Sequence, residues 1–242
     1  QNITFLGDKA SGIGTLNLMD ATSSFDTVGI NVGNFGSGIV NVSNGATLNS
    51  TGYGFIGGNA SGKGIVNIST DSLWNLKTSS TNAQLLQVGV LGKGELNITT
   101  GGIVKARDTQ IALNDKSKGD VRVDGQNSLL ETFNMYVGTS GTGTLTLTNS
   151  GTLNVEGGEV YLGVFEPAVG TLNIGAAHGE AAADAGYITN ATKVEFGSGE
   201  GVFVFNHTNN SDAGYQVDML ITGDDKDGKV IHDAGHTVFN AG

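Results

Sequence analysis

Gly64-Ile-Val-Asn-Ile68 and Gly94-Glu-Leu-Asn-Ile98 are two copies of one five-residue phrase, and looser copies occur along most of the chain. Each copy begins at a glycine: Gly14, Gly38, Gly64, Gly94, Gly119, Gly143, Gly170 and Gly201. Successive glycines lie about 24 to 31 residues apart. A period of this length is typical of repeat proteins, in which each unit buries its apolar side against the next unit.

Each unit contains two further short apolar pieces. One of them, the second phrase, ends in glycine, as in Phe55-Ile-Gly57. The other lies between the five-residue phrase and this second phrase, as in Thr152-Leu-Asn-Val155. Apolar and polar residues alternate within these pieces, which indicates β-strands. The glycine and asparagine residues of the repeat are expected to form sharp corners. The sequence therefore predicts an all-β fold, a right-handed single-stranded parallel β-helix (solenoid) with about 24–27 residues and three short strands per coil.

Stacked coils place equivalent residues in columns about 4.8 Å apart. Two columns of the first phrase are aliphatic and are expected to face the core: Leu16, Val40, Val66, Leu96, Val121, Leu145 and Leu172, then Leu18, Val42, Ile68, Ile98, Val123, Leu147 and Ile174. The residue between them faces water and is most often asparagine. A register error of one residue would turn both aliphatic columns outward, so the register is strongly specified.

The repeat also predicts the domain organisation. Residues 1–205 are expected to form about eight coils, with corner insertions at residues 77–84 and 175–186. Residues 206–242 lose the regular spacing, and we expect an irregular further coil or a truncated continuation of the β-helix. Because an open solenoid end exposes unpaired strand edges, the native chain is expected to continue beyond it.

Charge and composition limit the partners. The chain has 242 residues and a net charge of −11 at pH 7, a sign that repels nucleic acids and anionic lipid. No apolar run approaches the roughly 20 residues that cross a bilayer as a helix, so this stretch is not expected to span a membrane. The sequence has no cysteine, which excludes disulfides and thiolate chemistry.

The candidate functional residues are short polar side chains that recur once per coil. One column follows the first strand: Asp20, Asn44, Thr70, Thr100 and Asn149. The other is the outward position inside that strand: Asn17, Asn41, Asn67 and Asn97. Short polar residues suit tight turns, which explains the first column without a ligand. The same residues could also supply an adhesion surface with many hydrogen bonds of about 0.5–1.5 kcal/mol each, and both interpretations stay open.

The sequence shows no catalytic arrangement of residues beside these polar columns. Enzymes that cleave glycans need carboxylates or basic groups raised together on one face, whereas the outward column is mostly asparagine. Glu156, Glu159 and Glu166 fall within one coil, and solvated surface acids explain them more simply. We predict that the chain is not an enzyme and that it uses no cofactor and no metal.

The glycine-anchored phrases, together with Val204-Phe-Asn-His-Thr208, resemble the passenger domains of AIDA-type autotransporters, the self-associating bacterial adhesins of the antigen 43 type. The resemblance covers essentially the whole chain. It implies a β-helix displayed at the bacterial cell surface or secreted, with the native protein tethered by a C-terminal outer-membrane β-barrel. The implied partners are the same protein on neighbouring cells, or a host surface protein or glycan.

The resemblance implies an adhesion module that promotes aggregation, biofilm formation or attachment through repeated polar contacts along a rod. The alternative is a carbohydrate-binding or carbohydrate-cleaving β-helix. Exposed aromatic side chains along one face would favour that alternative, but Trp74 is the one tryptophan in the sequence.

Overall fold

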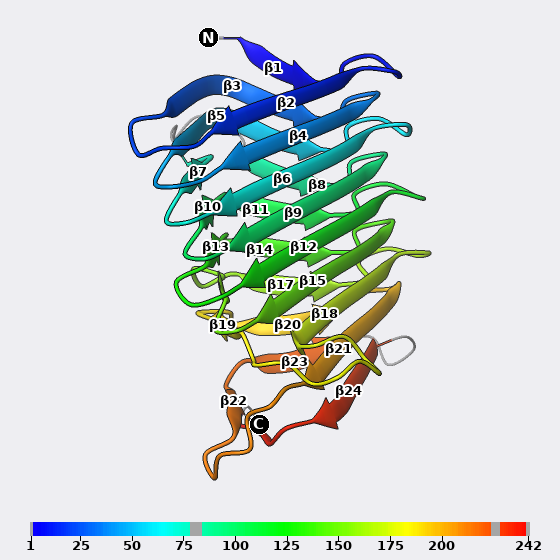
Figure 1. Ribbon diagram of the computed structural model, residues 1–242. Coiled ribbons are helices and arrows are strands. Elements are labelled where there is room, and N and C mark those ends of the chain that lie inside the picture. The colour runs from blue at the N-terminus through cyan, green and yellow to red at the C-terminus, as the bar shows by residue number, and fades with distance from the viewer. Residues whose placement is uncertain (1, 78–83, 224–227, 241–242) are drawn as a thin grey trace.

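Parallel pairing between successive coils builds the structure. The computed structural model describes residues 2–77, 84–223 and 228–240, and these residues form strands and turns but no helix. The named strands pair in parallel, for the most part with their equivalents one coil away. The result is a β-solenoid of about nine turns that winds in the right-handed sense (Figure 1). The predicted all-β parallel β-helix is therefore confirmed.

The first phrase of each coil forms one sheet of nine strands, which faces the viewer in Figure 1. Its strands, in spatial order, are β2 (Ile13–Leu18), β4 (Ser37–Val42), β6 (Lys63–Ser69), β9 (Lys93–Thr99), β12 (Lys118–Asp124), β15 (Thr142–Thr148), β18 (Val169–Gly175), β21 (Glu200–Asn206) and β24 (Gly228–Ala234).

The other two pieces of each coil form a 14-stranded sheet that closes the solenoid. The strands before the glycine-ended corner are β1 (Ile3–Leu6), β3 (Ser24–Val32), β5 (Thr47–Ile56), β8 (Leu85–Val88), β11 (Asp108–Ile111), β14 (Asn134–Val137), β17 (Glu159–Leu162), β20 (Lys193–Phe196) and β23 (Leu220–Gly223). The short middle strands are β7 (Leu73–Asn75), β10 (Ile103–Lys105), β13 (Leu129–Glu131), β16 (Thr152–Asn154) and β19 (Tyr187–Thr189). β5 pairs with both β7 and β8, so it runs through both positions.

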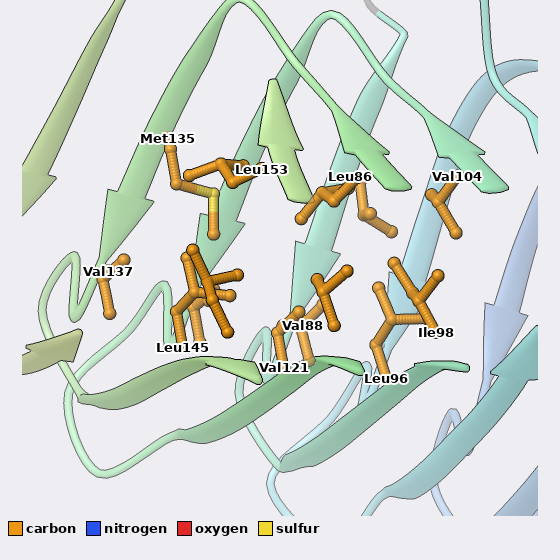
Figure 2. Close-up of a cluster of buried hydrophobic side chains, with 14 of the residues drawn as sticks. Leu86, Val88, Leu96, Ile98, Val104, Val121, Met135, Val137, Leu145 and Leu153 are labelled. Atoms are coloured by element: carbon orange, nitrogen blue, oxygen red, sulfur yellow. The ribbon is translucent and has the colours of Figure 1, made fainter. Parts of the chain in front are cut away.

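The predicted aliphatic columns line the interior in the expected register. Val66, Leu96 and Val121 are partners across β6, β9 and β12, and all three are fully buried. Figure 2 shows Leu96, Val121 and Leu145 in one row, faced from the opposite side of the coil by Leu86, Met135 and Leu153. Each buried side chain of this size stabilises the fold by about 1.5–3 kcal/mol.

Glycine has two different roles in the repeat. The glycines that begin the first phrase are not corner residues, because they lie inside strands and lack a positive φ. A Cβ on Gly64 would lie 2.1 Å from the carbonyl oxygen of Val32, so this position needs glycine for close approach between coils. The corner interpretation is correct at the second phrase, where Gly57 has a φ of +72°.

The insertion expected at residues 175–186 folds back over the nine-stranded sheet. Asn206 of β21 is buried, and its Nδ2 donates to the carbonyl oxygens of Ala177 and Glu180 at 2.8 and 2.9 Å. His178 in the same segment lies 2.8 Å from Asp233 of β24. Of the other expected insertion, at 77–84, residues 78–83 lie outside the described residues.

The chain after residue 205 adds a further, less regular coil. β24 pairs with β21 and β23 pairs with β20, while the register of β24 shifts between Phe205 and Asn206. β22 (Tyr215–Val217) and β25 (Thr237–Phe239) pair with each other in a separate two-stranded sheet. Residues 206–223 and 228–240 therefore extend the solenoid.

Candidate functional site

The structure brings the four candidate asparagines of the first strand into one hydrogen-bonded ladder. The Nδ2 of Asn41 donates to the Oδ1 of Asn17 at 2.8 Å, Asn67 donates to Asn41 at 2.8 Å, and Asn97 donates to Asn67 at 3.0 Å. The four side chains lie on the outer face of β2, β4, β6 and β9. The predicted column is therefore a continuous row of amides along the rod.

Part of the hydrogen-bonding capacity of this asparagine ladder is used internally. An amide has two N–H donors and an oxygen with two lone pairs. Each ladder bond uses one donor and one lone pair, and the Nδ2 of Asn97 also donates to Glu95 at 2.7 Å. The inner asparagines keep one donor and one lone pair each for water or a partner. The ladder thus stabilises strand pairing and still presents a polar edge.

The ladder position does not stay open along the whole rod. Arg122 and Thr146 follow Asn97 in the same column, and Asn173 then donates to the hydroxyl of Thr146 at 3.1 Å. Asn173 is only 2% exposed and Val204 is fully buried, because the segment 176–186 covers them. An interaction surface on this column is therefore limited to β2 through β15.

The corner column has a conformational explanation. Asn44, Thr70, Thr100 and Asn149 are exposed and have φ values of +57°, +53°, +52° and +52°. Asp20 differs, because it lacks a positive φ and its Oδ1 accepts from the backbone N–H and the hydroxyl of Thr22 at 3.0 and 2.6 Å. These hydrogen bonds lower the pKa of Asp20. This left-handed backbone suits the two asparagines, whereas the two threonines adopt it at a cost in strain.

Two corner side chains are bound to the neighbouring coil. The Nδ2 of Asn44 donates to the carbonyl oxygen of Met19 at 3.1 Å, and that of Asn149 donates to Asp124 at 2.6 Å. Although partial burial acts to raise it, the pKa of Asp124 is lowered on balance by the hydrogen bonds from Asn149 and Thr148. The amide groups of Asn44 and Asn149 therefore serve intramolecular contacts first.

A depression of about 490 Å³ lies at this corner between coils. Thr100 and Asn149 line it together with the carboxylates of Asp71 and Asp124. Within the described ranges no group of three His, Cys, Asp or Glu residues is placed to hold a metal ion. The depression exposes polar groups of the corner column to water.

A second groove, of about 370 Å³, was not found from the sequence. It runs along the outer face of β6, β9, β12 and β15 between two columns of side chains. One column contains Lys63, Lys93 and Lys118, and the other contains Ile65, Glu95 and Asp120. Loss of hydration, with a contribution from the negative charge of Glu95, raises the pKa of Asp120. A sequence signal did exist, because the dipeptide Lys-Gly opens three successive phrases.

Six aromatic side chains of the described residues are exposed, namely Phe5, Phe35, Phe133, Phe165, Tyr187 and Phe239, whereas Tyr136, Tyr161 and Trp74 are at least partly covered. Tyr136 and Tyr161 stack on neighbouring coils with ring centroids 5.0 Å apart and planes 6° apart, so each ring covers one face of the other. The hydroxyl of Tyr161 donates to Glu159, which raises the pKa of Tyr161. Trp74 is fully buried and donates to the hydroxyl of Ser50 at 3.1 Å. Sugar stacking on these residues would need open faces.

The glutamates considered for catalysis have separate partners. Glu156 forms an ion pair with Lys77, and Glu159 contacts Lys193 at 3.4 Å. Glu166 is exposed at the corner between β17 and β18. The three side chains do not converge on one point.

The residues 204–208, which carry part of the family resemblance, have structural roles. Val204, Phe205 and His207 are fully buried. The Nε2 of His207 lies 2.9 Å from the hydroxyl of Thr237. Burial, with a smaller contribution from His232, lowers the pKa of His207. This segment packs the last coils and offers no accessible binding group before Thr208.

Comparison with known proteins gives one informative match. The chain is 98% identical over 223 residues to the "Uncharacterized lipoprotein YdeK" of Escherichia coli (strain K12). The match covers 92% of this chain and 17% of that protein. No family model and no solved structure matches the chain.

The chain thus spans about a sixth of the length of the relative it matches. It represents a β-helical segment whose function is not established. Within the residues that the structure describes, no helix is long and apolar enough to cross a bilayer.

Proposed function

We propose that this segment is part of a rigid adhesive rod at the surface of a bacterial cell. The rod would promote self-association or attachment through repeated polar contacts. The observation that carries the proposal is the asparagine ladder on the outer face of β2–β9, where the same amide recurs in each coil. Regular spacing lets one geometry of contact repeat along two aligned rods.

The energetics of such a surface fit adhesion better than tight binding of a small ligand. A hydrogen bond of this kind contributes about 0.5–1.5 kcal/mol, so one coil holds a partner only weakly. Contacts repeated along a rigid rod, and between many rods on two surfaces, add through multivalency. The polar row from Asn17 to Thr146 supplies such repetition.

The location rests on the relative and on the family resemblance. The relative is described as a lipoprotein, and acyl chains can hold a protein in a membrane. A cell-surface location of this segment, tethered by the rest of the native chain, is consistent with that description. The autotransporter resemblance supports display outside the cell and supports self-association as the activity.

Carbohydrate binding is the second candidate function. The observation in its favour is the stack of Tyr136 and Tyr161 beside the carboxylate of Glu159. The stack closes one face of each ring, and Trp74 is buried. The repeated amide row therefore supports adhesion more strongly than the aromatic residues support glycan binding.

The test uses the full-length protein that contains this segment. Cells that display it are expected to clump, and the purified protein is expected to sediment as larger species as its concentration rises. A matched variant replaces Asn41, Asn67 and Asn97 by threonine, which keeps strand propensity but removes the amides, and should clump less. A strict monomer with dispersed cells would exclude self-association, and binding on a glycan array by that monomer would favour the second candidate.

A further inference from the structure

Two outward columns of unlike charge run side by side on the nine-stranded sheet. Lys63, Lys93 and Lys118 are partners at the first outward position of β6, β9 and β12. Two residues along the same strands, Glu95 and Asp120 are partners and form the acidic column. The columns are separated by about 6.6 Å along the strand and repeat about every 4.8 Å along the rod.

The charges of these two columns form no ion pair among the described residues, although Glu95 accepts a hydrogen bond from Asn97 at 2.7 Å and Arg122 acts on Asp120 through its charge. In the described part of the chain, none of the three lysines and neither acid forms an ion pair, whereas Lys77, Lys105 and Lys193 on other faces all do. The groove between the columns is about 370 Å³ and its walls include Ile65. Two rows of charged groups without salt bridges, beside an open groove, are therefore available to an external partner.

We propose that the lysine column and the acidic column form a self-complementary surface on which a second copy docks face to face, parallel and in register. The proposal rests on the self-association proposed above and gives it a second surface, beside the asparagine ladder. A twofold axis parallel to the rod, midway between the columns, places Lys93 opposite Glu95 of the second copy and Lys118 opposite its Asp120. The same axis repeats both pairs in the other direction, which gives four ion pairs in an isologous interface.

The charge order also selects the direction of the two rods. In an antiparallel face-to-face arrangement, the twofold axis runs along the strands and places the lysine column of one copy over that of the other. Like charges then meet in both columns, which disfavours that arrangement. Parallel docking puts equivalent ends of both rods on the same side. This surface would therefore cluster molecules anchored in one membrane, and contacts between cells would rest on the asparagine ladder.

The charges of the groove also favour a second copy over an anionic polymer. A polyanion would gain contacts with the lysines but would meet Glu95 and Asp120 in the same groove. A second copy offers an acid to each paired lysine and a lysine to each acid. Charge exchange therefore distinguishes a second copy from a polyanion.

The experiment uses charge exchange in the full-length protein, measured by sedimentation velocity. Variant one carries Lys93→Glu and Lys118→Glu, and variant two carries Glu95→Lys and Asp120→Lys. Each variant alone should raise the Kd of self-association by about tenfold or more, because four attractive pairs become repulsive. An equimolar mixture of the two should return to the affinity of the unmodified protein. The control, Lys9→Glu with Arg107→Glu, makes the same net charge change as variant one at exposed sites outside the columns.

A third variant with all four substitutions tests the direction. It should self-associate like the unmodified protein but should not co-associate with it, because parallel docking would then oppose like charges. Co-association of these two proteins would show antiparallel docking and overturn the proposal. Equal association of all variants would exclude this surface while leaving self-association intact, and a monomeric unmodified protein would overturn both. Binding of a polyanion that variant one loses and the mixture does not regain would assign the groove to such a ligand.

Discussion

Thr70 and Thr100 have φ values of +53° and +52°, a backbone region that β-branched residues rarely enter. Asn44 and Asn149 occupy the same place in their coils with nearly the same φ, and asparagine tolerates this region well. The asparagines of the corner column therefore follow from the shape of the corner, whereas the threonines are strained there. Any role of these residues in adhesion would come in addition to the conformational requirement of the corner.

Replacing Thr100 with asparagine tests this explanation. Because asparagine relieves the strain of a β-branched residue at positive φ, Thr100→Asn should stabilise the fold by about 1 kcal/mol. The preceding residue, Thr99, lies in β9, where Thr99→Asn should instead destabilise through lower strand propensity. Denaturant unfolding of the full-length protein measures both. Equal effects of the two substitutions would contradict the conformational explanation.

The sequence predicts which residues form the polar columns but not what their side chains bind. The alternation in Gly64-Ile-Val-Asn-Ile68 places Asn67 outside, and the period places it beside Asn41 and Asn97. The hydrogen bond from Asn149 to Asp124 could not be predicted, because it depends on the path of the corner between two coils. The lysine column could not be predicted from the five-residue phrase, because each lysine precedes the repeat glycine and lies outside that phrase.

At the scale of strands, one residue of register decides the entire fold. Leu145 is fully buried between Val121 and Leu172, whereas its neighbour Thr146 lies outside between Arg122 and Asn173. The strand types and their register could be predicted because the repeat shows each column many times. Two features could not be predicted: that β5 runs through two strand positions, and the path of residues 176–186. Both differ from the regular coil, and a repeat pattern describes only the regular coil.

The register makes a sharp prediction for two adjacent positions of β15. Leu145→Asp buries a carboxylate without a partner and should destabilise the fold by several kcal/mol. Thr146→Asp places the same group outside, beside Arg122, and should change the stability by less than about 0.5 kcal/mol. Far-ultraviolet circular dichroism during denaturant unfolding measures both. If the two substitutions cost the same, the assigned register is wrong.

At the scale of the whole molecule, short-range attraction and long-range repulsion act together. The chain carries a net charge of −11, so two parallel rods repel each other over distances set by the ionic strength. The proposed docking surface is different, since Lys63, Lys93 and Lys118 outnumber Glu95 and Asp120 there. The local surface is therefore less acidic than the molecule, and salt affects the two interactions over different ranges.

These two ranges predict a maximum of self-association at intermediate salt. At 0.01 M the screening length is about 30 Å, so the net charge of one rod repels the other across its full width. At 0.1 M it falls to about 10 Å, which screens the distant charges more than the close ion pairs, and near 1 M it is about 3 Å and the exposed pairs weaken too. Sedimentation velocity of the full-length protein at these three concentrations should give the largest species at 0.1 M. Association that strengthens steadily to 1 M would instead indicate an interface held by apolar contacts, because salt strengthens burial of apolar surface and weakens exposed ion pairs.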